Sequence, residues 1–125
     1  MKFSTHRMVK SEDLNGANTL FGGKALAWID EEAAIFSFLI LNSKNLVTKA
    51  MSQVDFRAPA HLGDIIELGC DVVRFGRTSI TVRCAMRNKT TKQDIITIDE
   101  ITFVHLDVDG KSAPHGITEM RNDDV

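Results

Sequence analysis

The chain has 125 residues, a length that suits a single domain with one hydrophobic core. Its hydrophobic fraction of 43% and charged fraction of 26% are typical of soluble globular proteins, and its net charge of −2 offers no overall field that would attract nucleic acid. No signal peptide or membrane span is evident, because the most apolar run, residues 33–41, is too short and follows two glutamates. We therefore expect a cytoplasmic protein that binds neither nucleic acid nor membrane.

The first half of the chain predicts one strand, one loop and one long helix. Residues 2–9 alternate weakly between polar and apolar and form the first predicted strand. Residues 11–19 are polar, and their acids and asparagines favour turns. Residues 22–42 then show apolar side chains at three- and four-residue spacing, which predicts a buried helical stripe. The stripe consists of Leu26, Ile29, Ala33, Phe36 and Ile40. A sheet curled around this helix would bury it almost fully.

The second half predicts strands. An extended run over residues 46–57 comes first and ends before a proline. Residues 64–75 and 78–88 both alternate with period two and are joined across Gly76, which predicts a hairpin with one buried face.

The last predicted strand covers residues 94–106. Its apolar side chains change parity at Asp99 and Glu100, which predicts a β-bulge there. Residues 111–125 are polar, and we expect them to form a loosely ordered tail. One helix ahead of antiparallel strands indicates a single α+β domain over residues 1–125.

The two cysteines lie in neighbouring predicted strands. Cys70 and Cys84 share the parity of the apolar residues around them, so we interpret them as two buried reduced thiols rather than a disulfide or a metal site. The four histidines share no ligand spacing, and we assign no metal.

A carboxylate in the helix suggests chemistry. Asp30 lies beside Leu26 at the edge of the apolar stripe, whereas Glu31 points to the opposite side. Gly22 and Gly23 at the helix start lack a Cβ, so a ligand oxygen could approach free backbone N–H groups at the positive end of the helix dipole. These donors and a carboxylate about 10 Å further along the axis could hold a carbonyl and deliver a base or nucleophile to it.

The acids of the helix also have structural interpretations. Asp30 could form an ion pair with Arg57 or Lys49. Glu31 and Glu32 fit a solvated face or an interface pair better than a catalytic set.

Several different short motifs follow one another along the chain, each occurring once. They are Asn15, Gly22-Gly23, Trp28-Ile29-Asp30, Val54-Asp55-Phe56-Arg57-Ala58-Pro59, Gly63-Asp64 and Gly76-Arg77-Thr78-Ser79-Ile80. In this order and spacing, residues 15 to about 106 resemble the hotdog-fold acyl-CoA thioesterases, specifically the group of cytosolic acyl-CoA hydrolases and bacterial YciA-like enzymes. Asn18 replaces a glycine of the family pattern, and asparagine can still adopt a left-handed conformation.

The resemblance implies a hotdog fold, in which an antiparallel sheet of five or six strands wraps around one long central helix. It implies hydrolysis of acyl-CoA to a free carboxylic acid and CoA, without a metal or another cofactor. It also implies a homodimer as the minimum unit, with each active site at the shared interface, and further assembly to a tetramer or hexamer.

The resemblance assigns catalytic roles to four residues. Asp30 aligns with the catalytic acid, which acts as general base on water or as nucleophile on the carbonyl. Asn15 aligns with a loop asparagine that is supplied across the interface to position substrate or water, although it could instead cap a turn. The N–H groups of Gly22 and Gly23 would form the oxyanion site.

A second set of residues is expected to bind CoA. Gly76, Arg77, Thr78 and Ser79 match a loop that contacts the CoA nucleotide and phosphates in relatives, and Arg57 belongs to another matched stretch. An arginine is a suitable phosphate ligand, although the same four residues also make an ordinary hairpin turn.

Two other functions on the same fold stay open. A non-catalytic acyl-CoA-binding or sensor module would keep the Arg77 loop and needs no acid, so Asp30 favours the hydrolase. A dehydratase or hydratase normally pairs a histidine with the acid, and no histidine lies near Asn15 or in the helix.

Overall fold

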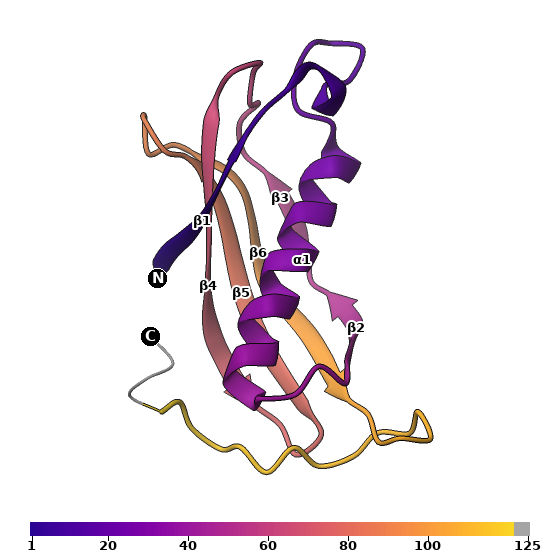
Figure 1. Ribbon diagram of the computed structural model, residues 1–125. Coiled ribbons are helices and arrows are strands. Elements are labelled where there is room, and N and C mark those ends of the chain that lie inside the picture. Colours follow the sequence, from indigo (N-terminus) through magenta and orange to yellow (C-terminus); the bar gives the residue numbers. More distant parts are fainter. Residues whose placement is uncertain (122–125) are drawn as a thin grey trace.

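The computed structural model describes residues 1–121, in which one helix lies across one face of an antiparallel sheet (Figure 1). The elements are β1 (Lys2–Met8), a short 3-10 turn η1 (Ser11–Asp13), α1 (Gly22–Leu41), β2 (Leu46–Met51), β3 (Val54–Phe56), β4 (Ile65–Phe75), β5 (Ser79–Asn88) and β6 (Asp94–His105). The strand order is β1-β4-β5-β6-β2, and β3 also pairs with β6. The predicted α+β architecture is confirmed. No helix within residues 1–121 has both the length and the apolar character needed to cross a membrane.

The core lies between α1 and the inner face of the sheet. Ile29 and Ala33 on the helix are fully buried and belong to one apolar cluster with Ile80, Val82 and Ile101 of the sheet. The predicted helical stripe therefore faces the strands. Burial of this apolar area is the main favourable contribution to folding.

The helix is not buried on all sides, which differs from the expectation of a sheet closed around it. Ile35 is 45% exposed and Leu39 is 70% exposed. The sheet covers one side of α1, so side chains on the far flank stay in contact with solvent.

The bulge predicted in the last strand is present. Between Val82 and Cys84, β5 advances by two residues while its partner on β6 changes by three, from Ile101 to Ile98. The extra residue falls within positions 99–100, where the apolar side chains change parity. The bulge is therefore confirmed.

The single strand expected over residues 46–57 is interrupted at Ser52 and Gln53. The backbone N–H of Ser52 donates to the carbonyl of Glu100 at 2.8 Å, and the Ser52 Oγ accepts from the Glu100 N–H at 3.0 Å. The interruption lies opposite the β6 bulge, whose extra residue breaks the regular ladder and separates β2 from β3.

The β4–β5 hairpin closes across Gly76, as predicted. The Gly76 N–H donates to the Ser79 carbonyl at 2.9 Å, and a Cβ at Gly76 would collide with the Ser79 Oγ. The hairpin register places Cys70 directly opposite Cys84 with Cα atoms 4.4 Å apart, and the two form a disulfide. The expectation of two reduced thiols is wrong, because parity reports only the face of a strand, whereas register decides which side chains meet.

The tail was expected to be loosely ordered, but residues 111–121 make specific contacts. They run beneath the C-terminal end of α1 and the β4–β5 turn (Figure 1). The Nε2 of His115 donates to the carbonyl of Ser79 at 2.7 Å, and Ile117 and Met120 pack against the core. The last four residues lie outside the described part of the chain.

The outer face of the sheet contains a buried carboxylate. The Glu67 side chain is 1% exposed and contacts Arg87 at 2.6 Å, Lys89 and Lys92 at 3.3 Å and His6 at 3.5 Å. Burial alone would raise the pKa of Glu67. Hydrogen bonds from the arginine and the two lysines, together with the arginine charge, outweigh burial and lower this pKa to about 2.

We expect Glu67→Gln to destabilise the protein by about 2 kcal/mol at neutral pH, because three cations lose their shared counter-charge. The folded-state pKa lies below the ordinary value of 4.5, so the carboxylate stabilises the fold fully above 4.5. This contribution is lost as the pH falls from 4.5 towards 2. Urea unfolding of both proteins across this range measures it, with Asp94→Asn at an exposed position as control. A difference that stays constant down to about pH 3 would contradict the assignment.

Candidate active site

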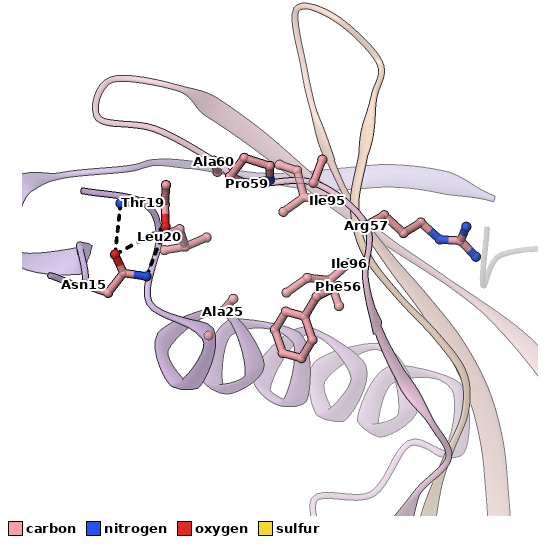
Figure 2. Close-up of a pocket in the computed structure, with 12 residues that line it drawn as sticks. Asn15, Thr19, Leu20, Ala25, Phe56, Arg57, Pro59, Ala60, Ile95 and Ile96 are labelled. Carbon is pink, nitrogen blue, oxygen red and sulfur yellow. Dashed lines mark hydrogen bonds between the residues drawn. The ribbon is translucent and has the colours of Figure 1, made fainter. Parts of the chain in front are cut away.

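The start of α1 presents backbone donors to a cavity. The N-cap residue is Phe21, and no side chain caps the helix. The first N–H groups of a helix have no intrahelical acceptor, and the helix dipole makes them favourable partners for a negative oxygen. A cavity of about 350 Å³ adjoins this end of the helix (Figure 2). Its lining includes Asn15, Thr19, Leu20, Gly22, Phe56 and Ile96.

Asn15 organises the loop that borders this cavity. Its Oδ1 accepts from the N–H groups of Ala17 at 2.9 Å and Thr19 at 3.1 Å. Its Nδ2 donates to the Thr19 Oγ1 at 3.0 Å. Asn18 has a φ of 63°, the left-handed conformation expected for this position. The turn-capping interpretation of Asn15 is therefore confirmed, and its catalytic role stays a prediction.

Asp30 lies outside this cavity, on the flank of α1 that faces β2. Its side chain is half-buried, and its Oδ1 accepts from the Thr48 Oγ1 at 2.8 Å. Eight residues separate it from Gly22, which corresponds to about 12 Å along the axis. Within residues 1–121 Asp30 forms no ion pair. The alternative prediction, in which Asp30 pairs with Arg57 or Lys49, is therefore wrong.

Arg57 borders the cavity, but its guanidinium points away from it (Figure 2). The Arg57 Nε donates to the Thr97 Oγ1 at 2.8 Å, and the guanidinium pairs with Asp55 at 3.1 Å. Its expected contact with substrate stays a prediction that would require a different rotamer or a second subunit.

The other four residues expected to bind CoA lie at the opposite end of the sheet from Arg57. Gly76 to Ser79 form the β4–β5 turn, near the C-terminal end of α1 (Figure 1). The tail contacts this turn, since the His115 N–H donates to the Arg77 carbonyl at 3.3 Å and the His115 Nε2 donates to the Ser79 carbonyl at 2.7 Å. The exposed guanidinium of Arg77 makes no ion pair within the described residues. Within one subunit the predicted site residues therefore lie in three separate places: at the start of α1, on the flank of α1 that faces β2, and at the β4–β5 turn.

Sequence reasoning missed two contacts at these places. Thr48 orients Asp30, and its parity with the half-buried Leu46 could have placed it on the helix side of β2. The Phe56 ring packs over Gly22, where a Cβ would lie 3.3 Å from a ring carbon. No local pattern signals that contact, because the two residues are distant in sequence.

The edge of the sheet beside Asp30 is open. Strand β2 pairs with β6 on one side only within the described chain. An unpaired edge presents free N–H and C=O groups that can pair with a strand of another chain.

Comparisons with known proteins agree with this architecture. The family model of the thioesterase superfamily matches residues 17–95, and the chain belongs to this family. YkhA, an uncharacterized acyl-CoA thioester hydrolase of Bacillus subtilis (strain 168), is 33% identical over 105 residues, which cover 82% of this chain and 60% of YkhA. The chain thus spans about three fifths of the length of this curated relative.

Two solved structures illustrate the similarity. An acyl-CoA hydrolase from Staphylococcus aureus, in complex with butyryl coenzyme A, coenzyme A and coenzyme A disulfide, is 33% identical with a TM-score of 0.79, covering 88% of this chain and 66% of that chain. Cj0915, a hexameric hotdog fold thioesterase of Campylobacter jejuni, is 27% identical with a TM-score of 0.76, covering 96% of this chain and 90% of that chain. The helix and sheet described above form the hotdog fold, as the sequence resemblance implied.

We expect Asn15→Ala to lower the free energy of unfolding by about 1 kcal/mol, because two backbone N–H groups lose their acceptor. Asn15→Asp keeps the acceptor oxygen and should cost less. Urea denaturation of both variants, with Asn45→Ala at an exposed position as control, measures the effect. An Asn15→Ala loss no larger than that of the control would contradict the turn-capping role.

Proposed function

We propose that the protein hydrolyses the thioester of acyl-CoA to a free carboxylic acid and CoA. The observation that carries this proposal is Asp30, a half-buried helical carboxylate that is oriented by Thr48 and free of ion pairs within residues 1–121. It lies two turns from an uncapped helix start, in a chain of the thioesterase superfamily. A carboxylate held by one hydroxyl keeps lone pairs available for a proton or a carbonyl carbon.

Two routes are compatible with this arrangement. As general base, Asp30 takes a proton from water while the water oxygen bonds to the thioester carbonyl carbon. The N–H groups of Gly22 and Gly23 stabilise the resulting oxyanion. The C–S bond then breaks, and the CoA sulfur takes the proton from Asp30. As nucleophile, the Asp30 oxygen bonds to the carbonyl carbon, CoA leaves, and water hydrolyses the mixed anhydride.

The proposed chemistry requires a second subunit. About 12 Å of helix separates Asp30 from Gly22, whereas an oxyanion donor must lie about 3 Å from its oxygen. A two-fold axis at the open β2 edge would make the two helices antiparallel. The partner's helix start and its asparagine loop could then approach Asp30. We infer a homodimer as the minimum unit and further assembly to a tetramer or hexamer, as in the hexameric Cj0915.

The CoA phosphates are assigned to the β4–β5 turn. Arg77 is exposed and has no ion-pair partner in the described chain, so its guanidinium can bind a phosphate without first breaking a contact. In the antiparallel dimer, the β4–β5 turn of one subunit lies at the same end as the helix start of the other.

We expect Asp30→Asn to lower kcat for acyl-CoA hydrolysis at least about 100-fold, because the amide can neither accept the proton nor attack the carbonyl. A thiol reagent that detects released CoA, applied to acyl-CoAs of increasing chain length, measures the rate. Glu31→Gln is the matched control, because Glu31 is an exposed neighbouring acid of the same helix. Circular dichroism shows whether each variant is folded.

A folded Asp30→Asn protein with wild-type rates would exclude the assigned role of this acid. Tight acyl-CoA binding by the wild type without release of CoA would instead favour a non-catalytic acyl-CoA-binding module.

We expect Arg77→Ala to raise KM for acyl-CoA about tenfold and to change kcat by less than about twofold, because the contact is made equally in the ground and transition states. Arg83→Ala is the control, because Arg83 is also an exposed arginine and pairs with Asp71 at 2.9 Å. Steady-state kinetics of both variants measure the difference. An equal KM for the two variants would refute phosphate binding by Arg77.

A further inference from the structure

Two histidines fix the backbone of the β4–β5 turn at three consecutive carbonyl groups. The Arg77 carbonyl accepts from the His115 N–H at 3.3 Å, and the Ser79 carbonyl accepts from the His115 Nε2 at 2.7 Å. Between them, the Thr78 carbonyl accepts from the N–H of His105 at the end of β6, at 2.7 Å. The chain that follows β6 therefore holds the peptide groups on the C-terminal side of the Arg77 side chain.

The imidazole of His115 is held in one orientation through both of its nitrogens. Nε2 donates to the Ser79 carbonyl, and Nδ1 accepts from the Ile117 N–H at 3.0 Å. The ring also packs edge-on against Phe75, with centroids 6.5 Å apart. Because one nitrogen donates and the other accepts, the proton of the ring is on Nε2. His115 is therefore a fixed hydrogen-bond donor to the turn.

The tail is anchored on both sides of His115. On the N-terminal side, the Ala113 N–H donates to the His105 carbonyl at 2.9 Å, and the His105 Nδ1 donates to the Ala113 carbonyl at 2.9 Å. On the C-terminal side, Ile117 packs against the core. Gly116 between them has a φ of 76°, a left-handed conformation that glycine adopts without strain. The position of the His115 ring is thus set by contacts that do not involve the turn.

These contacts leave the Arg77 side chain available. All three use backbone carbonyls of the turn, so they fix the backbone of Arg77 and do not occupy its guanidinium. A long side chain on an ordered backbone loses less conformational entropy when it binds a ligand than the same side chain on a mobile turn. His115 itself is not placed to bind substrate, because both ring nitrogens already have partners.

We propose that His115 is a positioning residue for CoA, which holds the β4–β5 turn in the conformation in which Arg77 binds a CoA phosphate. This inference rests on the part of the proposed function that assigns CoA binding to Arg77. It does not depend on hydrolysis, since a turn that binds CoA is needed by a hydrolase and by a non-catalytic acyl-CoA-binding module alike.

Isothermal titration calorimetry with CoA tests the proposal without requiring turnover. His115→Ala is expected to raise the Kd for CoA about fivefold, and to raise KM for acyl-CoA similarly while kcat changes by less than about twofold. His115→Gln should stay within about twofold of the wild-type Kd, because its side-chain amide can still donate to the Ser79 carbonyl. His61→Ala is the matched control, since this histidine lies outside the tail and its side chain is 63% exposed.

A double-mutant cycle separates positioning from a general structural role. If His115 acts through Arg77, then His115→Ala in an Arg77→Ala background should change the Kd for CoA by less than about twofold. A purely structural role would weaken CoA binding by the same factor in both backgrounds. Gly116→Ala strains the tail next to His115 and should raise the Kd about threefold, which keeps the test available if His115→Ala does not fold.

Three results would overturn the proposal. They are no binding of CoA by the wild type, a wild-type Kd in folded His115→Ala and Gly116→Ala proteins, and an equal effect of His115→Ala with and without Arg77. Failure of the proposed hydrolysis gives a different result. In that case the wild type binds CoA with the expected dependence on His115 and Arg77 but releases no CoA from acyl-CoA, which supports the positioning role and refutes hydrolysis.

Discussion

One face of α1 packs on the sheet, and this packing determines which side chains of the helix stay available for contacts with a ligand or a second subunit. The stripe around Ile29 and Ala33 is buried against the strands and holds the helix in place. Both flanks remain outside that contact, and each carries a carboxylate. Asp30 faces the open edge at β2, and Glu32 lines a cavity beside β1. Because successive residues are turned by about 100° around the helix axis, two acids only two positions apart point to opposite sides of the helix.

The groups proposed for thioester chemistry do not meet within one subunit. Gly22 lies at the helix start, Asp30 two turns further along, and Arg77 at the far end of the sheet. The β2 edge is the place where a second copy could bring them together, since its backbone groups lack a neighbour on one side. In this view association is part of the catalytic arrangement, because a single subunit separates the donors from the acid.

Sequence reasoning succeeded where a local pattern of apolar residues allows only one arrangement of the backbone. The parity change at Asp99 and Glu100 located a bulge, because an extra residue must shift which side chains face the core. It failed for Cys70 and Cys84, because their shared parity is compatible with a disulfide and with two separate thiols. The contact between His115 and the β4–β5 turn was not predicted for a related reason, because it joins segments that are distant in sequence and no local pattern indicates it.

The sequence by itself determined the long helix, the strands that follow it and the acid at the edge of the apolar stripe, because hydrophobic period and spacing act over neighbouring residues. Only the tertiary structure decided how the polar side chains are paired. Asp30 accepts from Thr48, and Arg57 turns to Thr97. These outcomes depend on which side chains from distant segments the sheet register brings within about 3 Å, and a hydrophobic pattern does not contain that information.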